Sequence, residues 1–192
     1  MKRIGLTGSI GAGKSTAAAW LRAQGVPVHD ADAAVHGIYA RPETLAWLHK
    51  NFPGAVQDDQ LDRARLAQII YAAPDKKKQL EDFIHPRVRA HREAFVREAI
   101  ARGEKIAVLD IPLLFETGAE AEMDAVWLIT APLAIRRARA VTRLGMTPEK
   151  FDIINAAQMD EAEKRRRATV IIENDGAVET LYAQLAQQLA ML

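Results

Sequence analysis

Near its start the chain carries a glycine-rich stretch whose residue types and spacing suit phosphate binding, Gly8-Ser9-Ile10-Gly11-Ala12-Gly13-Lys14-Ser15-Thr16. It fits the pattern G-x-x-x-x-G-K-[ST], in which glycines let backbone N–H groups turn inward around phosphate oxygens. In this motif Lys14 reaches the β- and γ-phosphates, and the hydroxyl of Ser15 binds Mg²⁺. The stretch therefore predicts a site for a nucleoside triphosphate.

The elements beside this stretch are those that the motif needs. Residues 2–7 are typical of a short strand, and residues 17–21 are compatible with a helix that begins near Lys14. The positive end of that helix's dipole would point at the same phosphates. The alternative is a glycine-rich turn that matches by chance, and the order of strand, loop and helix argues against it.

Two further predicted strands lead to aspartates. Val26–His29 precedes Asp30 and Asp32, and Ile106–Leu109 closes on Asp110. Ligands of open α/β sheets collect at the carboxyl ends of the strands, so these carboxylates are candidate site residues. Either Asp30 or Asp32 could accept a proton from an acceptor hydroxyl or cap the next helix, and position alone leaves both roles open. The setting of Asp110 resembles that of the acid that orients Mg²⁺ through water.

Two regions of the chain are predicted to be helical and carry basic side chains. Between about residues 44 and 101, three or so helices would form a small substrate-side subdomain, and Pro86 is expected to end one of them beside His85. Later, Arg139 and Arg143 stand four residues apart and share a helix face. They suggest a mobile lid that clamps phosphates, and an exposed basic helix is the alternative.

Composition limits the classes of partner. The chain has 26 Lys and Arg against 25 Asp and Glu, so no overall field attracts nucleic acid or an anionic membrane. The basic run Lys164–Arg167 is weak support for nucleic-acid binding. The absence of cysteine excludes disulfides and cysteine-based catalysis or metal sites. No segment approaches the roughly 18 apolar residues of a membrane span. We expect a cytoplasmic protein without nucleic-acid or membrane partners, and its oligomeric state stays open.

Separate stretches along nearly the whole chain resemble dephospho-coenzyme A kinases. The stretches are Ile4–Gly8, Asp30–Asp32, Leu61–Arg63, Ile84–Pro86, Asp110–Glu116, Arg139 with Arg143, Gln158, and Asn174–Gly176. The phosphate loop alone is widespread among proteins, whereas His85-Pro86 together with the 110–116 stretch is far more selective.

The resemblance implies an α/β fold of the nucleoside-monophosphate-kinase type, with three layers and a five-stranded parallel sheet in the order 2-3-1-4-5. A single P-loop kinase domain would fill residues 1–192. Within it, residues 1–32 and 93–192 would form the nucleotide-binding core, 33–92 a helical substrate-binding insert, and 137–165 a lid.

The resemblance also implies an activity, in which Mg²⁺ and ATP phosphorylate the ribose 3′-hydroxyl of dephospho-coenzyme A in the last step of coenzyme A synthesis. Asp32 would orient and deprotonate that hydroxyl, while Lys14 and Arg139 or Arg143 would offset charge on the transferred group. Asn174 would lie near the adenine of ATP. The expected acceptor contacts are Thr7, Asp32, Arg63, His85, Arg89, Leu114 and Glu116.

The sequence departs from the family pattern at two places. Asn155 stands where many relatives carry arginine, which puts a polar contact from that helix in doubt, and Arg165 is a candidate substitute. Thr169 stands where relatives usually have aspartate. Another small-molecule kinase is the nearest alternative, because the fold does not select the acceptor. A regulatory GTPase is disfavoured, since residues 110–113 lack the Asp-x-x-Gly pattern.

Overall fold

The structure is a computed structural model that describes all residues from 1 to 192. The chain divides into two compact units, which we call the core unit, residues 1–29 and 98–192, and the helical unit, residues 30–97. Each unit has its own cluster of buried apolar side chains. The expected insert, 33–92, lies within the helical unit, and Asp32 falls in this unit and not in the core unit.

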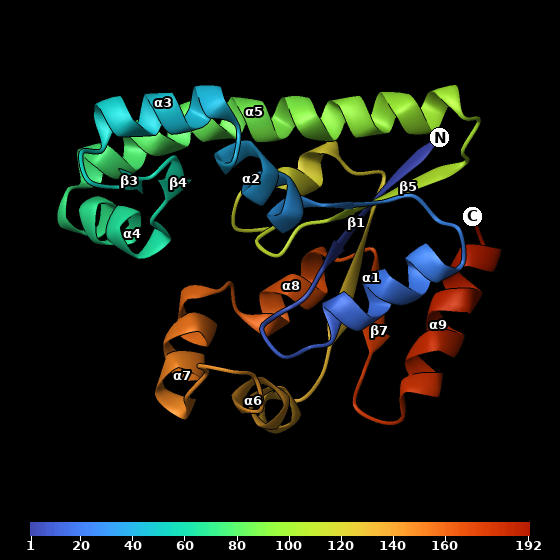
Figure 1. The fold of residues 1–192 in the computed structure, drawn as a ribbon. Coiled ribbons are helices and arrows are strands. Elements are labelled where there is room, and N and C mark those ends of the chain that lie inside the picture. The colour runs from blue at the N-terminus through green and yellow to red at the C-terminus, as the bar shows by residue number, and fades with distance from the viewer. The chain divides into compact units, whose positions relative to one another are not determined.

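The core unit is built on a five-stranded parallel sheet (Figure 1). Its strands are β1 (Lys2–Thr7), β2 (Val28–Asp30), β5 (Ile106–Asp110), β6 (Ala125–Thr130) and β7 (Val170–Glu173). Their spatial order, β2-β5-β1-β6-β7, is the expected order 2-3-1-4-5 when only the strands of this sheet are numbered. In the central strand β1, Leu6 pairs with Asp110 on one side and with Trp127 on the other, so the loop after β1 begins at the middle of the sheet.

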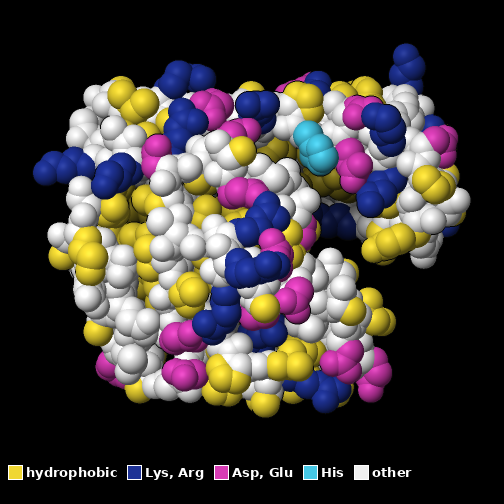
Figure 2. Space-filling model, turned by 180° about the vertical axis from the view of Figure 1, so that it is seen from behind, with side chains coloured by type: hydrophobic (Ala, Val, Ile, Leu, Met, Phe, Trp, Pro, Cys, Tyr) yellow, Lys and Arg dark blue, Asp and Glu magenta, His cyan; other side chains and the backbone are white.

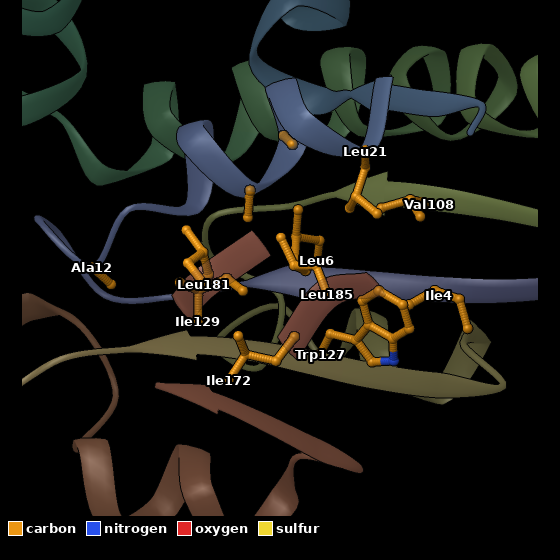
Figure 3. Close-up of a cluster of buried hydrophobic side chains, with 12 residues drawn as sticks. Ile4, Leu6, Ala12, Leu21, Val108, Trp127, Ile129, Ile172, Leu181 and Leu185 are labelled. Carbon is orange, nitrogen blue, oxygen red and sulfur yellow. The ribbon is translucent and has the colours of Figure 1, made fainter. Parts of the chain in front are cut away.

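Helices cover this sheet. Those of the core unit are α1 (Lys14–Ala23), α6 (Leu133–Val141), α7 (Pro148–Ala157), α8 (Glu161–Arg167) and α9 (Val178–Ala190), with a 3₁₀ turn at Ala119–Glu122. Helices α1 and α9 lie side by side, and Leu21, Leu181 and Leu185 pack with Trp127 in the fully buried cluster drawn in Figure 3. Burying a leucine side chain is worth about 1.5–3 kcal/mol, so this layer fixes α1 and the loop before it.

The helical unit contains α2 (Ala31–Tyr39), α3 (Pro42–Asn51), α4 (Arg63–Ala72) and all but the last turn of α5 (Pro74–Ala101). A short antiparallel hairpin of β3 (Val56–Gln57) and β4 (Gln60–Leu61), which the sequence did not predict, lies between α3 and α4. Its turn places Asp58 and Asp59 at positive φ, 47° and 56°, a conformation that aspartate tolerates better than most residues.

The expectation that Pro86 ends a helix is wrong, because Pro86 lies inside the 28-residue helix α5. Proline removes one N–H donor, so the preceding turn needs other support. The guanidinium of Arg87 donates a hydrogen bond to the carbonyl of Phe83 (2.7 Å) and stacks 3.5 Å from the centre of the Phe83 ring. On its other side this ring stacks on Trp47 at 3.7 Å. The Phe83 ring, packed between Arg87 and Trp47, thus stabilises the helical turn beside the proline.

The surface mixes the two signs of charge. On the face shown in Figure 2, basic and acidic side chains alternate and do not gather into one patch. None of the helices combines the length and the apolar character that crossing a bilayer requires.

Candidate active site

The loop between β1 and α1 depends on glycine at two positions. Gly11 and Gly13 have φ angles of +79° and +98°, in the left-handed region that other residues avoid. A Cβ on Gly13 would lie 2.1 Å from Nδ2 of Asn174, and one on Gly11 would lie 2.2 Å from the carbonyl oxygen of Arg136. The glycines therefore serve both the turn and the close approach of neighbouring elements.

Lys14 and Asp110 come together at the end of the loop. Their side chains form an ion pair and are only 17% and 6% exposed. Ser15 is exposed in the first turn of α1. One hydroxyl and one carboxylate fit Mg²⁺, which keeps several waters and takes phosphate oxygens as further ligands. No group of three or more His, Cys, Asp or Glu side chains forms a cage for a metal.

A pocket of about 300 Å³ opens beside the loop. The residues that line it include Gly11, Gly13, Ser15, Thr16, Arg139, Arg143, Asn174 and Gly176. Asn174, at the end of β7, donates from Nδ2 to the carbonyl of Ala12 (2.8 Å), and its own carbonyl accepts a hydrogen bond from Arg139 (2.7 Å). The expectation that Arg143 shares a helix face with Arg139 is wrong, because α6 ends at Val141 and Arg143 lies in the turn that follows. Its side chain is exposed and makes no hydrogen bond or ion pair. The pocket thus has one engaged arginine and one free arginine.

Beside the loop lies a polar cluster in which buried Ser9 and Lys164 meet the partly exposed Glu116 and Glu161. Lys164 is completely buried, and its ammonium donates to Oγ of Ser9 (3.1 Å) and lies 3.2 Å from Oε1 of Glu116. Ser9 in turn donates to Glu161 (2.6 Å). Burial raises the pKa of the Glu116 carboxyl, but backbone N–H groups, Met159 among them, and the charge of Lys164 outweigh it and hold the pKa below its ordinary value of 4.5. The cluster ties α8 to the loop.

Arg136 provides a second support for the loop. Its guanidinium, 5% exposed, donates to the carbonyls of Ala131 (3.1 Å) and Ile10 (3.4 Å) and to Oδ1 of Asn155 (2.8 Å). The N–H of Ile10 donates to the side chain of Gln158 (2.9 Å). Asn155, the departure from the family pattern, is therefore an acceptor that links α7 to α6. Arg136 and Lys164 are the site-supporting residues that sequence reasoning missed, since each stood within a run of basic residues.

The basic run at the end of α8 is paired with carboxylates. Beyond the buried Lys164, Arg165 binds Glu173 with two hydrogen bonds of 2.7 and 3.0 Å. Arg166 forms an ion pair with Glu163, and Arg167 forms one with Glu120. Partner carboxylates thus account for the whole run, and Arg165 is engaged at β7, not at the position of Asn155.

The expected acceptor contacts in the core unit are Thr7, Leu114 and Glu116. Thr7 and Leu114 are fully buried, and the hydroxyl of Thr7 donates to the carbonyl of Pro112 (3.2 Å). Their side chains expose no atoms to a ligand in this structure. They hold the 110–116 loop in place, while Glu116 carries the charge that pairs with Lys164.

The remaining candidates belong to the helical unit. Asp30 caps α2 by accepting from the N–H of Ala33 (2.9 Å), so the capping role falls to Asp30. Asp32 is exposed in the first turn of α2, and its side chain has no hydrogen bond or ion pair. Arg63 begins α4, and His85 and Arg89 are exposed along α5. A carboxylate that is free of structural partners is available for chemistry.

Comparison with known proteins gives consistent results. A model of the dephospho-CoA kinase family matches residues 2–180. The chain is 48% identical to dephospho-CoA kinase from Deinococcus radiodurans, over 100% of this chain and 92% of that protein. It is 45% identical to the enzyme from Rhodopseudomonas palustris, over 96% of this chain and 92% of that one.

Solved structures agree on the fold. A crystal structure from Thermus thermophilus superposes with a TM-score of 0.86 at 41% identity, covering 100% of this chain and 97% of that one. Dephospho-CoA kinase from Campylobacter jejuni gives 0.74 at 24% identity, covering 98% of this chain and 95% of that one. A shikimate kinase from Bacteroides thetaiotaomicron gives 0.54 at 18% identity, with 100% and 99% covered, which shows a shared fold.

Replacement of Gly13 by alanine should abolish tight ATP binding. The Cβ would collide with Asn174, and the left-handed backbone would cost a further 1–2 kcal/mol or so. Gly25→Ala is the matched control, because Gly25 has φ +79° but no atom lies within 4 Å of its added Cβ. Titration calorimetry with Mg²⁺-ATP should show lost affinity only for Gly13→Ala. Equal affinities in the two variants would contradict the close approach of Asn174.

Removal of the charge of Glu116 should destabilise the fold in a pH-dependent way. Because the folded-state pKa is lowered, the carboxylate stabilises the protein above its ordinary pKa of 4.5, and this contribution is lost as the pH falls below that value. Urea unfolding of wild type and Glu116→Gln should therefore differ at neutral pH and converge in acid. The exposed Glu98→Gln should match wild type throughout, and a pH-independent gap for Glu116→Gln would refute the role of its charge.

Proposed function

The chain belongs to the dephospho-CoA kinase family, and we propose from this premise that it transfers the γ-phosphoryl group of Mg²⁺-bound ATP to the ribose 3′-hydroxyl of dephospho-CoA. ATP-dependent phosphorylation of dephospho-CoA, in coenzyme A biosynthesis, is the activity of the family. The observation that carries the assignment is the family match over nearly the whole chain, together with the phosphate loop and its Lys14–Asp110 pair. We also propose a cytoplasmic location.

The nucleotide would bind at the loop between β1 and α1. Backbone N–H groups of the loop and the positive end of α1 would hold the phosphates, and Lys14 would exchange its contact with Asp110 for phosphate oxygens. Ser15 and Asp110 would hold Mg²⁺, which offsets phosphate charge when it is bound. The pocket that Asn174 and Arg143 line would receive part of the nucleotide, with the adenine near Asn174.

Arg139, within α6, and Arg143, in the turn after it, would have different roles. Arg139 is held by the carbonyl of Asn174, so it supports the wall of the nucleotide pocket. Arg143 has no partner and lines the same pocket, so it is the cation available to the transferred phosphoryl group. A preorganised positive charge at that group stabilises the transition state more than the ground state.

Asp32 would act as the general base. It lies two residues beyond the end of β2 and carries no structural partner, while Asp30 caps the helix. A carboxylate in hydrogen-bond reach of the acceptor hydroxyl orients it and accepts its proton as the new bond to phosphorus forms. Asp30 would thus cap the helix, and Asp32, two residues later, would serve catalysis.

The proposed acceptor and base can be tested together. ADP release should be measured with Mg²⁺-ATP and dephospho-CoA, adenosine, AMP, shikimate or gluconate as acceptor. We expect turnover with dephospho-CoA alone, and a decrease in kcat of about 10²–10⁴ for Asp32→Asn. Asp30→Asn is the control, because asparagine caps a helix as well as aspartate does. Full activity of Asp32→Asn would remove Asp32 from catalysis, and turnover of a different acceptor would overturn the proposed substrate.

The division between the arginines predicts a second difference. Arg143→Ala should lower kcat by about 10³ or more, with little change in the thermal midpoint, because the side chain has no partner in the fold. Arg139→Ala should mainly lower stability and ATP affinity, since it breaks a contact to Asn174. Single-turnover kinetics and thermal unfolding of the two variants separate these effects. An unchanged kcat for Arg143→Ala would be inconsistent with a phosphoryl contact.

A further inference from the structure

A second pocket lies entirely within the helical unit. It has a volume of about 250 Å³ and is bounded by α2, the β3–β4 hairpin and the start of α4, all labelled in Figure 1. The side chains that line it include His36, Tyr39, Leu45, Asp59, Leu61 and Arg63. It therefore combines an apolar wall with several hydrogen-bonding groups, of which only Arg63 was expected from the sequence to contact the acceptor.

Arg63 at this pocket is a positioned cation without a carboxylate partner. Its Nη2 lies 2.6 Å from Nδ1 of His36, and its guanidinium lies 5.9 Å from the centre of the Tyr39 ring. A guanidinium has only donors, so Nδ1 of His36 is the acceptor in this contact. Because no carboxylate pairs with it and α4 begins at this residue, the positive charge of Arg63 stays available to an anion.

The face of α2 that leads to the pocket also carries Asp32. Asp32, His36 and Tyr39 are spaced four and three residues apart, so they lie along one stripe of the helix. From the first turn of α2 onwards, the stripe presents a free carboxylate, then the His36–Arg63 pair, then the partly apolar pocket at Tyr39. Burial raises the pKa of the Tyr39 phenol while the charge of Arg63 opposes the rise, so Tyr39 stays a neutral donor at physiological pH.

This order corresponds to the covalent order of dephospho-CoA. The acceptor has a ribose hydroxyl, then a 5′-diphosphate, then a pantetheine arm. We propose that the part of the pocket lined by Tyr39, Leu45, Asp59 and Leu61 binds the pantetheine arm, and that His36 is a positioning residue that holds Arg63, which lines the same pocket, for the diphosphate. The inference rests on the proposed function and assigns the parts of its acceptor to the helical unit.

The chemistry of the pocket suits the arm better than a second phosphate. Asp59 on its rim would repel an anion placed inside, whereas it accepts hydrogen bonds from amides and hydroxyls. Leu45 and Leu61 offer apolar surface to the arm's methyl and methylene groups. The arm alternates such groups with two amides and a hydroxyl, so it suits a pocket that has both apolar and hydrogen-bonding side chains.

The first test fills the pocket. Ala40 lines it and is exposed at the end of α2, so Ala40→Trp should occupy the space without disturbing the core. Saturation-transfer NMR with dephospho-CoA should then show a weaker signal at the methyl protons of the arm than at the adenine protons, relative to wild type. The KM for dephospho-CoA should rise about tenfold, which corresponds to the loss of roughly 50 Å² of apolar contact. Ala72→Trp, on the exposed side of α4, is the matched control.

The second test separates positioning from folding. His36→Ala removes the acceptor for Arg63 and should raise the KM for dephospho-CoA about tenfold, with a smaller effect on kcat and none on the KM for ATP. His36→Asn keeps an oxygen acceptor near the position of Nδ1 and should restore most of the affinity. Circular dichroism of the variants reports folding independently of the kinetics.

The outcomes distinguish this inference from the proposed function. An unchanged ratio of arm to adenine signal in Ala40→Trp would place the arm elsewhere and overturn the pocket assignment. Equal KM values for wild type and His36→Ala, or no rescue by His36→Asn, would overturn the role of His36. Wild type that turns over dephospho-CoA in those cases retains the proposed function, whereas wild type that neither binds nor phosphorylates dephospho-CoA refutes both.

Discussion

The loop after β1 can present its N–H groups to phosphates only if its other polar groups are satisfied from behind. Buried backbone groups without partners cost about 1–3 kcal/mol each, so every outward-facing group of the loop needs a donor or acceptor. The side chain of Asn174 donates to the carbonyl of Ala12. Gln158 accepts from the N–H of Ile10, and Arg136 donates to the Ile10 carbonyl. The hydroxyl of Ser9 accepts from Lys164 and donates to Glu161. The architecture of the core unit follows from this constraint, because these partners come from the end of β7 and from α6 to α8.

The same contacts connect the loop to the predicted lid, residues 137–165. Arg136 joins Ile10 to Asn155, so α6, α7 and the loop share one hydrogen-bonded side chain. A movement of α7 would therefore be felt at Ile10 through Asn155 and Gln158. The fully buried Lys164 anchors the far end of the lid region, since an unpaired buried ammonium would be strongly destabilising. If residues 137–165 act as the predicted lid, these two buried side chains would hold its two ends to the loop.

Local signals account for what the sequence predicted well. The order of strand, glycine-rich loop and helix depends on neighbouring residues, and so do the strands that end at Asp30 and Asp110; the structure confirms these elements and the sheet order. What failed depended on tertiary contacts. The Phe83 turn beside Pro86 packs against Trp47, and Lys164 is buried because Glu116 and Ser9 lie opposite it. These partners are distant in the sequence, and no periodicity reports them.

The choice between Asp30 and Asp32 shows how structure resolves what position leaves open. Both residues follow the same strand, and either side chain suits a helix start. Asp30 already accepts from the N–H of Ala33 as the N-cap of α2, so Asp32 is not needed for that role. An exposed carboxylate in the first turn gains little from the helix dipole, about 0.3–1 kcal/mol, and makes no other contact. Its contribution to stability is therefore small, and the argument for its presence is chemical: it shares a helix face with His36, which holds the unpaired charge of Arg63.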